Sequence, residues 1–589
     1  MHQDYLREYM NNHINLLSNF FNQYVDDGMK KNIFDELNKK SISIDFSSKS
    51  RQGDISSNFY LVAIKKIINK KFDLKNDLIK EINKLFFVEN CEISRNGFIN
   101  INIKKDFLLN QIKSLLEAKS KFGKSNFGKG KKVNVEFVSA NPTGPVTVAH
   151  MRGAVLGDVI SSLLAETGFE VTREYYVNNA GSQIDILGSS LYKRYLELFG
   201  EVIKLDNDEY PGSYLIKIAE KIKKNDEDKW INVDSDEREE YFKNFAVTFL
   251  IEFIKKDLEL LNINFDKFIF EKDIVSNQII NELFEILNDK KLLYKGTLEK
   301  PKGEDSDEWE PRQQLLFKSS HIFDHQDRAL QKSNGEWTYF ANDAAYHLDK
   351  YKRNFDKLIN IWGADHIGYI PRMKSVLKTI SGSDNYLEIL TCQIVRLIKN
   401  NEVLKMSKRE GNFITLREVF EQVGKDPLRY FMISTKSETS MDFDLNKVLE
   451  KNKDNPVFYC QYAYARASSV IKRSNEFKNF KNFKNSIDNI DKTTISEHEW
   501  EIILKLLTWP YVLINTAETK QTHKITNFLE DLCYHFHSFW NMGKENESLR
   551  FINEKNINQT ISKLIWIEAF RKVLNQAFNI IGIDSPESM

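Results

Sequence analysis

Two widely separated groups of side chains could handle phosphate. His150 follows the loop ANPTGPVTVA and lies near the start of a predicted helix, whose free backbone N–H groups and partial positive charge suit a phosphate. Far downstream, the string KMSK at residues 405–408 is followed by the polar residues 409–411. Two lysines three positions apart on a loop can close on a triphosphate and neutralise charge that develops during attack on phosphorus.

Each group alone also fits an ordinary structural role. A loop histidine commonly has no ligand, and a lysine-rich chain contains many solvated runs of charge. Methionine accounts for only 10 of 589 residues, so this four-residue string arises by chance in about one in a hundred such sequences. The two elements together therefore indicate phosphate chemistry much more strongly than either does alone.

The elements around His150 are those of an α/β domain. Val133–Val138 is a short β-rich run, and a helix with one apolar face is predicted from about His150 to Thr167. A second β-like run, Val171–Val177, completes a strand–helix–strand unit, which predicts a parallel sheet. Another such strand, Lys357–Trp362, leads into the loop GADH. The charged stretch from Leu198 to Tyr241 is interpreted as the surface of a helical insertion and not as active site.

The flanking regions predict two further domains. Near the N-terminus, a helical pattern over Asp4–Val25 precedes runs of alternating residues at Ile42–Phe46 and Ile99–Ile103, which suit strands with one face in water. The glycine- and lysine-rich stretch 119–132 is interpreted as a linker. From about Asn455 the apolar spacing is helical throughout, as expected of a bundle. His535 and His537 do not share a helical face, so core or surface positions are favoured over metal binding.

Composition excludes several classes of protein. Lys+Arg and Asp+Glu are both 84, so the formal net charge is zero and a globally basic nucleic-acid coat is excluded. The length predicts about three or four domains. The four scattered cysteines indicate neither a disulfide scaffold nor a zinc ribbon, and they suit a reducing compartment. The N-terminus is charged and no apolar run is long enough to span a bilayer. We expect a soluble, cytoplasmic protein.

The motifs resemble those of class I aminoacyl-tRNA synthetases, and specifically of arginyl-tRNA synthetases. ANPTGPVTVAH (140–150) resembles the HIGH region and KMSK (405–408) the second signature of that class. Sequences that resemble the arginyl family in particular are the EF-S-NPTGP stretch (136–145), RGAVLGD (152–158), YYVNNAG (175–181), TYFANDAAYHLDK (338–350), WGADH (362–366), DPLRYF (426–431), NPVFYCQYAYAR (455–466), GDISSN (53–58) and GFIN (97–100).

The resemblance implies a multidomain α/β fold. It predicts an additional N-terminal tRNA-binding α+β domain at 1–117, a class I Rossmann-type parallel-sheet catalytic domain with helical insertions at 118–454, and an all-α DALR-type anticodon-binding bundle at 455–589. The implied activity is ATP-dependent ligation of L-arginine to the 3′ end of tRNA(Arg) through an arginyl-adenylate, with release of AMP and pyrophosphate. ATP enters with Mg²⁺ as a substrate complex, no structural zinc is expected, and the enzyme is expected to be a monomer whose arginine activation needs bound tRNA.

The resemblance also implies roles for individual residues. The catalytic positions are His150, Lys405 and Lys408. The ATP-binding positions are Thr147, Ala149, His150, Gly153, Gly363, Asp365, His366, Met406 and Ser407. The arginine-binding positions are Glu136, Ser139, Asn141, Tyr339 and Asp343. The tRNA anticodon-binding positions are Tyr459, Tyr462 and Arg466.

Physical chemistry supports acids in the amino-acid pocket. A planar guanidinium with five donors is distinguished from a lysine ammonium by paired acceptors in fork geometry. Glu136 lies in a β-rich run where an unpaired acid would be costly, which predicts a cationic ligand or partner. For Asp343 the alternative is a helix N-cap ahead of Ala344, and the sequence by itself favours that alternative.

Two departures from the HIGH signature bear on activity. Thr147 replaces its first histidine and Ala149 its glycine; threonine can still hydrogen-bond a phosphate oxygen but cannot become cationic. A different class I enzyme is one alternative, but a cysteinyl enzyme needs a zinc-binding cysteine set, and a glutamyl enzyme needs basic residues where this chain has Glu136 and Asp343. A non-catalytic RNA-binding relative is the other alternative, supported by Thr147 and Ala149 and opposed by the intact KMSK and GADH.

Overall fold

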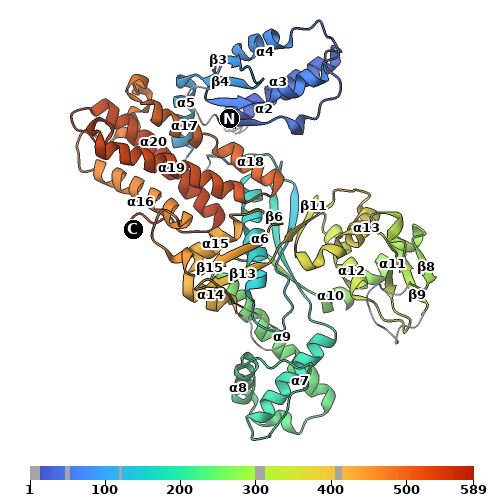
Figure 1. Ribbon diagram of the computed structural model, residues 1–589. Helices are drawn as coiled ribbons and strands as arrows, with labels where there is room; N and C mark the ends of the chain where they lie inside the picture. Colours follow the sequence, from blue (N-terminus) through green and yellow to red (C-terminus); the bar gives the residue numbers. More distant parts are fainter. Residues whose placement is uncertain (1–12, 47–52, 119–121, 277, 299–311, 405–413) are drawn as a thin grey trace. The chain divides into compact units, whose positions relative to one another are not determined.

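The computed structural model describes residues 13–46, 53–118, 122–276, 278–298, 312–404 and 414–589 (Figure 1). The chain divides into two compact units. One unit comprises residues 1–128, 166–168 and 450–589, and the other comprises residues 129–165 and 169–449. The first holds a small α+β domain and a helical bundle, and the second holds the sheet on which the candidate site is built.

The N-terminal α+β domain is an antiparallel sheet with helices. Its strand order is β1-β2-β4-β3, with every neighbouring pair antiparallel. Its elements are α2 (His13–Lys30), β1 (Ile44–Phe46), β2 (Ile55–Ser57), α3 (Phe59–Ala63), α4 (Leu74–Asn83), β3 (Val88–Ile93), β4 (Ile99–Ile103) and α5 (Lys105–Glu117). The predicted strands at 42–46 and 99–103 are confirmed by β1 and β4. The expectation of one wet face is wrong for Asn100, which is buried and accepts from Ser56 Oγ at 3.3 Å.

A five-stranded parallel sheet forms the centre of the second unit. Its order is β12-β11-β5-β6-β7, and all four neighbouring pairs are parallel. The strands are β5 (Lys132–Glu136), β6 (Glu170–Val177), β7 (Lys267–Phe270), β11 (Lys357–Gly363) and β12 (Leu387–Cys392). The register places Glu136 of β5 between Glu174 of β6 and Asn360 of β11. These polar residues are all buried, so two carboxylates lie side by side in the interior of the sheet.

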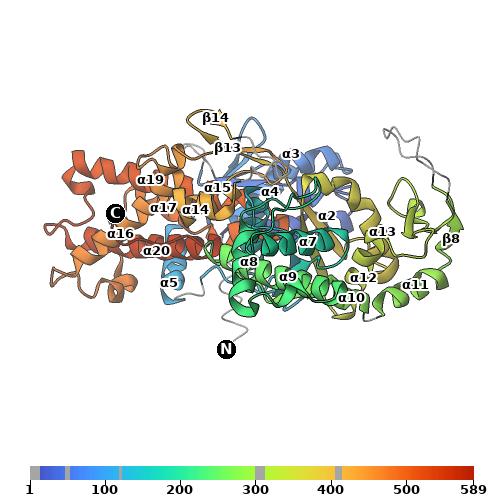
Figure 2. The same ribbon diagram turned by 90° about the horizontal axis from the view of Figure 1, so that it is seen from below.

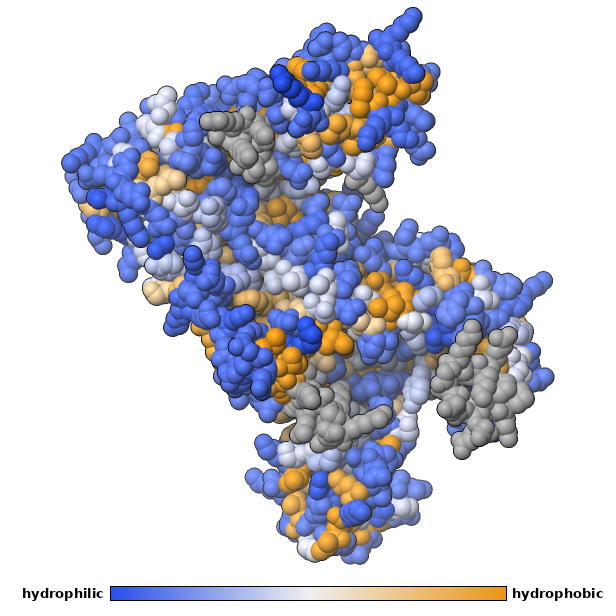
Figure 3. Space-filling model, in the orientation of Figure 1, coloured by the Kyte–Doolittle hydropathy of each residue, from blue (hydrophilic) through white to orange (hydrophobic). Residues whose placement is uncertain are grey.

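Helices and two small sheets surround this parallel sheet (Figures 1 and 2). The helices are α6 (Val148–Glu166), α7 (Ser182–Glu197), α8 (Tyr214–Asp226), α9 (Ser235–Glu259), α10 (Glu271–Ser276), α11 (Ile279–Asp289), α12 (Tyr339–Lys352), α13 (Ile370–Ser381), α14 (Leu416–Val423) and α15 (Lys425–Ile433). One small sheet contains β8 (Leu293–Gly296), β9 (Gln314–Phe317) and β10 (Arg328–Gln331), and the other contains β13 (Val395–Lys399), β14 (Glu402–Val403) and β15 (Met441–Asp444). Helices α7, α8 and α9 form an insertion between β6 and β7 that extends beyond the predicted Leu198–Tyr241 at both ends, with apolar side chains on part of its surface (Figure 3).

Helix α6 is the apolar core helix of this unit. Among the described residues it is the one helix long and apolar enough to cross a membrane, and 72% of that stretch is buried within the protein. A Cβ atom on Gly157 would lie 2.2 Å from the Phe137 ring, so glycine lets α6 approach the end of β5. Nearer the start of α6, Arg152 donates to the carbonyls of Gln393, Lys436 and Thr439, and Arg429 of α15 pairs with Asp158 at 2.5 Å. These contacts fix α6 to the segments that follow β12 and α15.

The C-terminal part of the first unit is the predicted helical bundle. Its helices are α16 (Pro456–Ser474), α17 (Glu497–Leu506), α18 (Trp509–Thr519), α19 (His523–Glu545) and α20 (Ile557–Ile581). Along α19 the apolar residues Phe528, Leu529, Leu532, Cys533 and Phe536 are buried, and Phe536 stacks on Phe570 of α20 with ring centroids 4.5 Å apart. The all-α prediction for this region is confirmed.

Candidate active site

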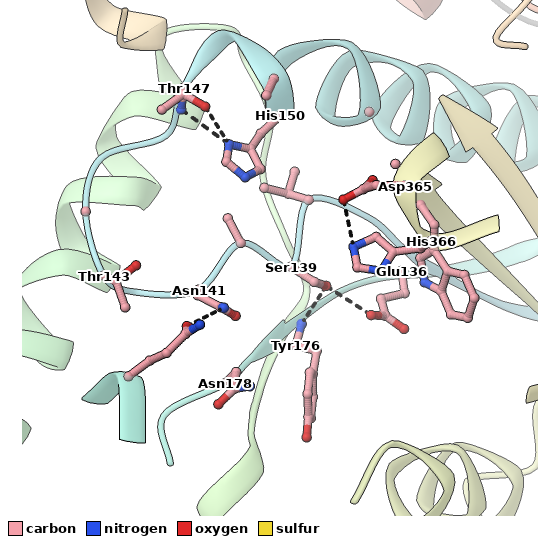
Figure 4. Close-up of a pocket in the computed structure, with 18 of the residues that line it drawn as sticks. Glu136, Ser139, Asn141, Thr143, Thr147, His150, Tyr176, Asn178, Asp365 and His366 are labelled. Carbon is pink, nitrogen blue, oxygen red and sulfur yellow. Dashed lines mark hydrogen bonds and ion pairs between the residues drawn. The ribbon is translucent and has the colours of Figure 1, made fainter. Parts of the chain in front are cut away.

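A cavity of about 820 Å³ opens at the carboxyl ends of the parallel strands. Its walls come from the ends of β5, β6 and β11, the starts of α6 and α10, the face of α12 and the loop after β11, with one contribution from the α7–α9 insertion (Figure 4). Open parallel sheets bind ligands at this edge, because the connecting loops diverge there. The cavity therefore lies where the topology alone would place a ligand.

Two glutamates that are neighbours in the sheet are neutralised by one helix. Lys350 of α12 is fully buried and lies 2.5 Å from Oε2 of Glu136, and Arg353, one turn later, pairs with Glu174 at 2.5 Å. Glu136 also accepts from Ser139 Oγ at 3.0 Å. The sequence analysis expected a cationic ligand or partner for Glu136, and Lys350 is that partner. Two cations three residues apart, one in the last turn of α12 and one at its C-cap, thus match a pair of carboxylates on adjacent strands.

The turn after β5 is strained. Val138 and Ser139 have φ angles of +68° and +38°, in the left-handed region that a β-branched residue such as valine rarely adopts. This turn brings Ser139 Oγ to Glu136 and lets it accept from the backbone N–H of Tyr176 at 3.1 Å (Figure 4). The strained turn thus positions Ser139 in the pocket wall. Strained backbone is common at functional sites.

Two further carboxylates face the cavity with no described cation bonded to them. Asp343 accepts from Tyr369 Oη at 2.8 Å, and Glu271 accepts from Asn342 Nδ2 at 2.7 Å. Burial, with added repulsion from Glu136 and Glu271, raises the pKa of Asp343 to about 7. Burial likewise raises the pKa of Glu271. Two acids held in this way favour a cationic ligand, which would restore both carboxylates to the ionised form.

The N-cap alternative for Asp343 is wrong. Helix α12 begins at Tyr339, and Thr338 caps it by accepting from the N–H of Ala341. Asp343 lies in the second turn, and its backbone carbonyl bonds His347 Nδ1 at 2.8 Å. Nε2 of His347 lies 2.9 Å from Asn360 Nδ2. Burial lowers the pKa of His347 to about 3, so this histidine is neutral and links α12 to β11 by hydrogen bonds.

The remaining arginine-binding predictions fall on the same cavity. Asn141 lines it and donates to Gln183 Oε1 at 2.9 Å (Figure 4). Tyr339 lines it as well and is largely exposed, with its hydroxyl close to Gly181. Glu136, Ser139 and Asp343 complete the predicted set, and all five line this one cavity.

The predicted ATP-binding residues that the structure describes line the other part of the cavity. Thr147, Ala149, His150 and Gly153 come from the start of α6, and Gly363, Asp365 and His366 follow β11. A Cβ on Gly153 would meet only Ile361, at 3.8 Å, which leaves open space there. His366 lies 3.5 Å from Asp365 (Figure 4). The predicted positions Lys405, Met406, Ser407 and Lys408 lie outside the described residues.

Two kinds of cavity residue, and one buried residue behind the cavity wall, were not predicted from the sequence. The insertion was interpreted as surface, yet Tyr210 and Tyr214 line the cavity, and Tyr214 Oη donates to the Thr143 carbonyl at 2.5 Å. Glu271 and the buried Lys350 were also missed. The PGS turn at residues 211–213, flanked by the two tyrosines, was the one local signal available for the insertion contact. No local pattern marks the partners of Lys350, because strand pairing determines them.

The predicted anticodon-binding residues form a cluster in the bundle. Arg466 bonds His537 Nδ1 at 2.9 Å and Tyr462 Oη at 3.1 Å, and its guanidinium lies over the rings of Tyr462 and Trp540. The Tyr459 ring centroid is 4.4 Å from that of His537. His537 is therefore a partner of this cluster, in agreement with its predicted non-metal role.

The fold and the site define a class I aminoacyl-tRNA synthetase. The family model for the class I (R) tRNA synthetase catalytic domain matches residues 111–453, and a Thermus thermophilus arginyl-tRNA synthetase shares the fold, with a TM-score of 0.68 and 18% identity over 93% of this chain and 96% of that one. The arginyl-tRNA synthetase N-terminal domain model matches residues 18–103 and the DALR anticodon-binding domain model matches residues 460–589.

Similar proteins of known name identify the family within this class. An arginine–tRNA ligase of Orientia tsutsugamushi (strain Boryong) is 40% identical over 560 residues, covering 94% of this chain and 95% of the relative. One of Bartonella bacilliformis is 39% identical over 561 residues, covering 94% and 96%. The chain belongs to the arginyl-tRNA synthetase family.

Proposed function

We propose that this chain carries out its family's reaction, ATP-dependent ligation of L-arginine to the 3′ end of tRNA, in the cavity at the carboxyl ends of β5, β6 and β11. One observation carries the proposal. A single cavity has two carboxylates with no described cation bonded to them, the half-buried Asp343 and the buried Glu271, in one wall and the start of α6 with His150 in another. A cationic amino acid and a polyphosphate are the ligands that these two walls suit.

The guanidinium of arginine is assigned to the acidic wall. Asp343 and Glu271 offer paired acceptors, while Lys350 already compensates the charge of Glu136. Glu136, Ser139 and Asn141 would then contact the amino-acid backbone end, and Tyr339 would lie across the bound side chain at the cavity mouth. Binding of the cationic side chain restores the charge balance that burial of the two carboxylates disturbs.

ATP is assigned to the wall formed by α6 and the segment after β11. Backbone N–H groups at the start of α6 and the His150 imidazole would contact phosphate oxygens, and Gly153 leaves room beside Ile361 for the nucleotide. Asp365 and His366 would flank the ribose beside Gly363, with Ala149 facing the nucleotide. Lys405 and Lys408 are proposed to stabilise charge on the transferring phosphates, with Met406 and Ser407 at the nucleotide.

Mg²⁺ enters with ATP as part of the substrate and shares the phosphate charge. In the part of the chain that the structure describes, no group of three or more His, Cys, Asp or Glu side chains is arranged to hold a metal ion. In the first step an arginine carboxylate oxygen attacks the α-phosphorus, and the bond to pyrophosphate breaks. In the second step the terminal tRNA hydroxyl attacks the acyl carbon, and AMP leaves. Positioning and electrostatics suffice for the transfer at phosphorus. In the acyl transfer the hydroxyl proton leaves with the AMP phosphate or to solvent.

The tRNA partner is assigned to the terminal domains. Residues 1–117 and 455–589, which precede and follow a catalytic domain at 118–454 in the sequence, are proposed as tRNA-binding domains. Tyr459, Tyr462 and Arg466 offer aromatic and guanidinium planes on which unstacked anticodon bases can lie. We further propose a monomer in the cytoplasm, a reducing compartment that suits four buried free cysteines.

ATP–pyrophosphate exchange with each of the twenty amino acids, with and without unfractionated tRNA, tests the proposal. We expect exchange with arginine alone and only when tRNA is present. Exchange with another amino acid would overturn the assignment of the acidic wall. Retained tRNA binding without any exchange would instead favour the non-catalytic RNA-binding alternative that Thr147 and Ala149 raise.

A further inference from the structure

The start of α6 contains a side-chain cap of unusual composition. Thr147 directly precedes the helix and His150 is its third residue. The backbone N–H of Thr147 donates to Nδ1 of His150 at 3.3 Å, Thr147 Oγ1 lies 3.1 Å from the same nitrogen, and the N–H of His150 donates back to the Thr147 carbonyl at 3.0 Å (Figure 4).

The same spacing occurs at two ordinary capping boxes in this chain. At α14 the N–H of Thr415 donates to Glu418 Oε2 at 2.7 Å, and at α17 the N–H of Ser496 donates to Glu499 Oε2 at 2.9 Å. In a capping box the side chain three residues into the helix accepts from the backbone of the cap residue. At α6 an imidazole nitrogen takes the place of that carboxylate.

This geometry determines which imidazole nitrogen carries the proton. A backbone N–H can only donate, so Nδ1 of His150 must offer its lone pair and the proton of the neutral ring resides on Nε2. The Thr147 hydroxyl can then add a second donor to Nδ1. A charged imidazolium would carry a proton on Nδ1 and would lose both contacts.

Thr147 lines the cavity, but its side chain is turned toward His150 and little of it is exposed. It is only 5% exposed, and its backbone lies in a β-bridge with Thr415. The N–H of Leu416 donates to the Val146 carbonyl at 2.8 Å, and the N–H of Val148 donates to Ile414 at 3.3 Å. The segment 146–148 is therefore held from one side by residues 414–416, while the threonine side chain is directed to His150.

We propose that Thr147 is a positioning residue that fixes His150 as the neutral Nε2–H tautomer, ready to donate to a phosphate oxygen of ATP. The donation to ATP rests on the proposed function. The assignment of the tautomer does not depend on it. The proposal gives Thr147 a role other than the direct ATP contact that the family signature implies. Thr147 thus stands where the signature has its first histidine, and it holds the second histidine of the signature, His150, in place.

The kinetic experiment compares T147V and T147S in the full chain by tRNA-dependent ATP–pyrophosphate exchange. Loss of one hydrogen bond predicts a kcat about 3- to 10-fold lower in T147V, with the KM for arginine unchanged, and a rate near the parent value in T147S. In an H150A background, T147V should cause no further loss, because Thr147 acts through His150. Equal losses with and without His150 would overturn the proposal.

A spectroscopic readout separates this inference from the proposed function. Long-range ¹H–¹⁵N NMR of the imidazoles, with H150Q used to assign the signal, should show the Nε2–H tautomer in the parent and a shift toward Nδ1–H in T147V. An Nδ1–H tautomer in the parent would refute the inference whatever the activity. Exchange that is unaffected by H150A would instead refute the proposed role of His150.

A matched variant controls for loss of a helix cap. S496A removes the side-chain cap of α17 in the bundle and should lower the melting temperature to an extent similar to T147V. It should leave the His150 NMR signal unchanged. If S496A also shifted that signal, the change in T147V would report general destabilisation and the positioning role would be withdrawn.

Discussion

The acidic wall and the nucleotide wall of the cavity are built in opposite ways. In the acidic wall, Glu271 is 3% exposed and Lys350 is fully buried, and each bonds a described side chain. In the nucleotide wall, the Asp365 and His366 side chains are 79% and 62% exposed and lie 3.5 Å apart. The acidic groups are held by protein side chains, whereas the segment after β11 in the nucleotide wall leaves its side chains in water.

The difference follows from what each wall has to recognise. Discrimination between arginine and lysine depends on acceptors whose geometry is fixed, since a mispaired buried carboxylate is costly. Discrimination at the nucleotide is less demanding, and the charge on phosphate is spread over several oxygens that backbone N–H groups can meet. A pre-organised wall also lowers the entropy cost of binding the amino acid.

The largest effect is expected when the acidic wall loses a charge. Asp343→Asn removes one of the paired carboxylates and should lower kcat/KM for arginine about 10³-fold, while the KM for ATP changes little. Steady-state exchange with each substrate varied in turn measures both. Asp349→Asn is the matched control, since Asp349 also lies on α12 but pairs with Arg353. Equal losses for both substrates would show that the two walls are not independent.

The next largest effect concerns the buried pair of Lys350 and Glu136. Lys350→Met leaves Glu136 buried without its cation and should reduce the free energy of unfolding by about 3–5 kcal/mol. The double variant Glu136→Gln, Lys350→Met should recover most of that loss, because no buried charge then remains. Urea denaturation followed by fluorescence compares the variants. A double variant as unstable as the single one would mean that packing, not charge, makes Lys350 important.

A smaller effect is expected from pH. Because burial raises the pKa of Asp343 to about 7 in the empty site, this carboxyl is protonated below pH 7 and must release its proton when arginine binds. Glu136, Glu271, Lys350 and the Tyr369 hydroxyl are the titratable groups that influence it.

The KM for arginine should therefore rise about tenfold between pH 8 and pH 6, whereas the KM for ATP should show no such change from this group. The same burial makes ionisation of Asp343 destabilising in the folded protein, so stability falls as pH rises from 3.8 to about 7 and this loss is complete above pH 7. Arginine should accordingly raise the melting temperature more at pH 8 than at pH 6. If the KM for arginine did not change between pH 6 and pH 8, the carboxyl of Asp343 would not titrate in this range and the prediction would be wrong.

The smallest effect is expected in the nucleotide wall. Asp365→Ala removes an exposed side chain and should raise the KM for ATP only about threefold, with stability changed by less than about 0.5 kcal/mol. Thermal melting and exchange kinetics measure the two quantities. A loss of stability as large as that of Lys350→Met would remove the contrast between the walls.

The sequence predicted the local units of this fold and missed the contacts between them. The strand–helix–strand unit around His150 and the helical bundle follow from apolar periodicity, which is a local property. Only the family resemblance pointed to Asp343 as a pocket residue. The local sequence instead favoured a helix N-cap there, but the helix begins four residues earlier, at Tyr339. Lys350 and Glu271 depend on strand pairing and helix docking across long stretches of chain, which no local pattern encodes. Tyr214 reaches the cavity through the folding of an insertion.

The strand order of the parallel sheet has a consequence for the synthesis of this chain. Strand β5 pairs with β6 soon after it is made, but its other neighbour is β11, at Lys357–Gly363. At roughly 5–20 residues per second, translation leaves that edge of β5 without its native neighbour for about ten to fifty seconds. Until then Glu136 also lacks Lys350. The nascent chain carries an apolar edge and a bare carboxylate during this interval, which is a stage at which chaperone binding would protect it.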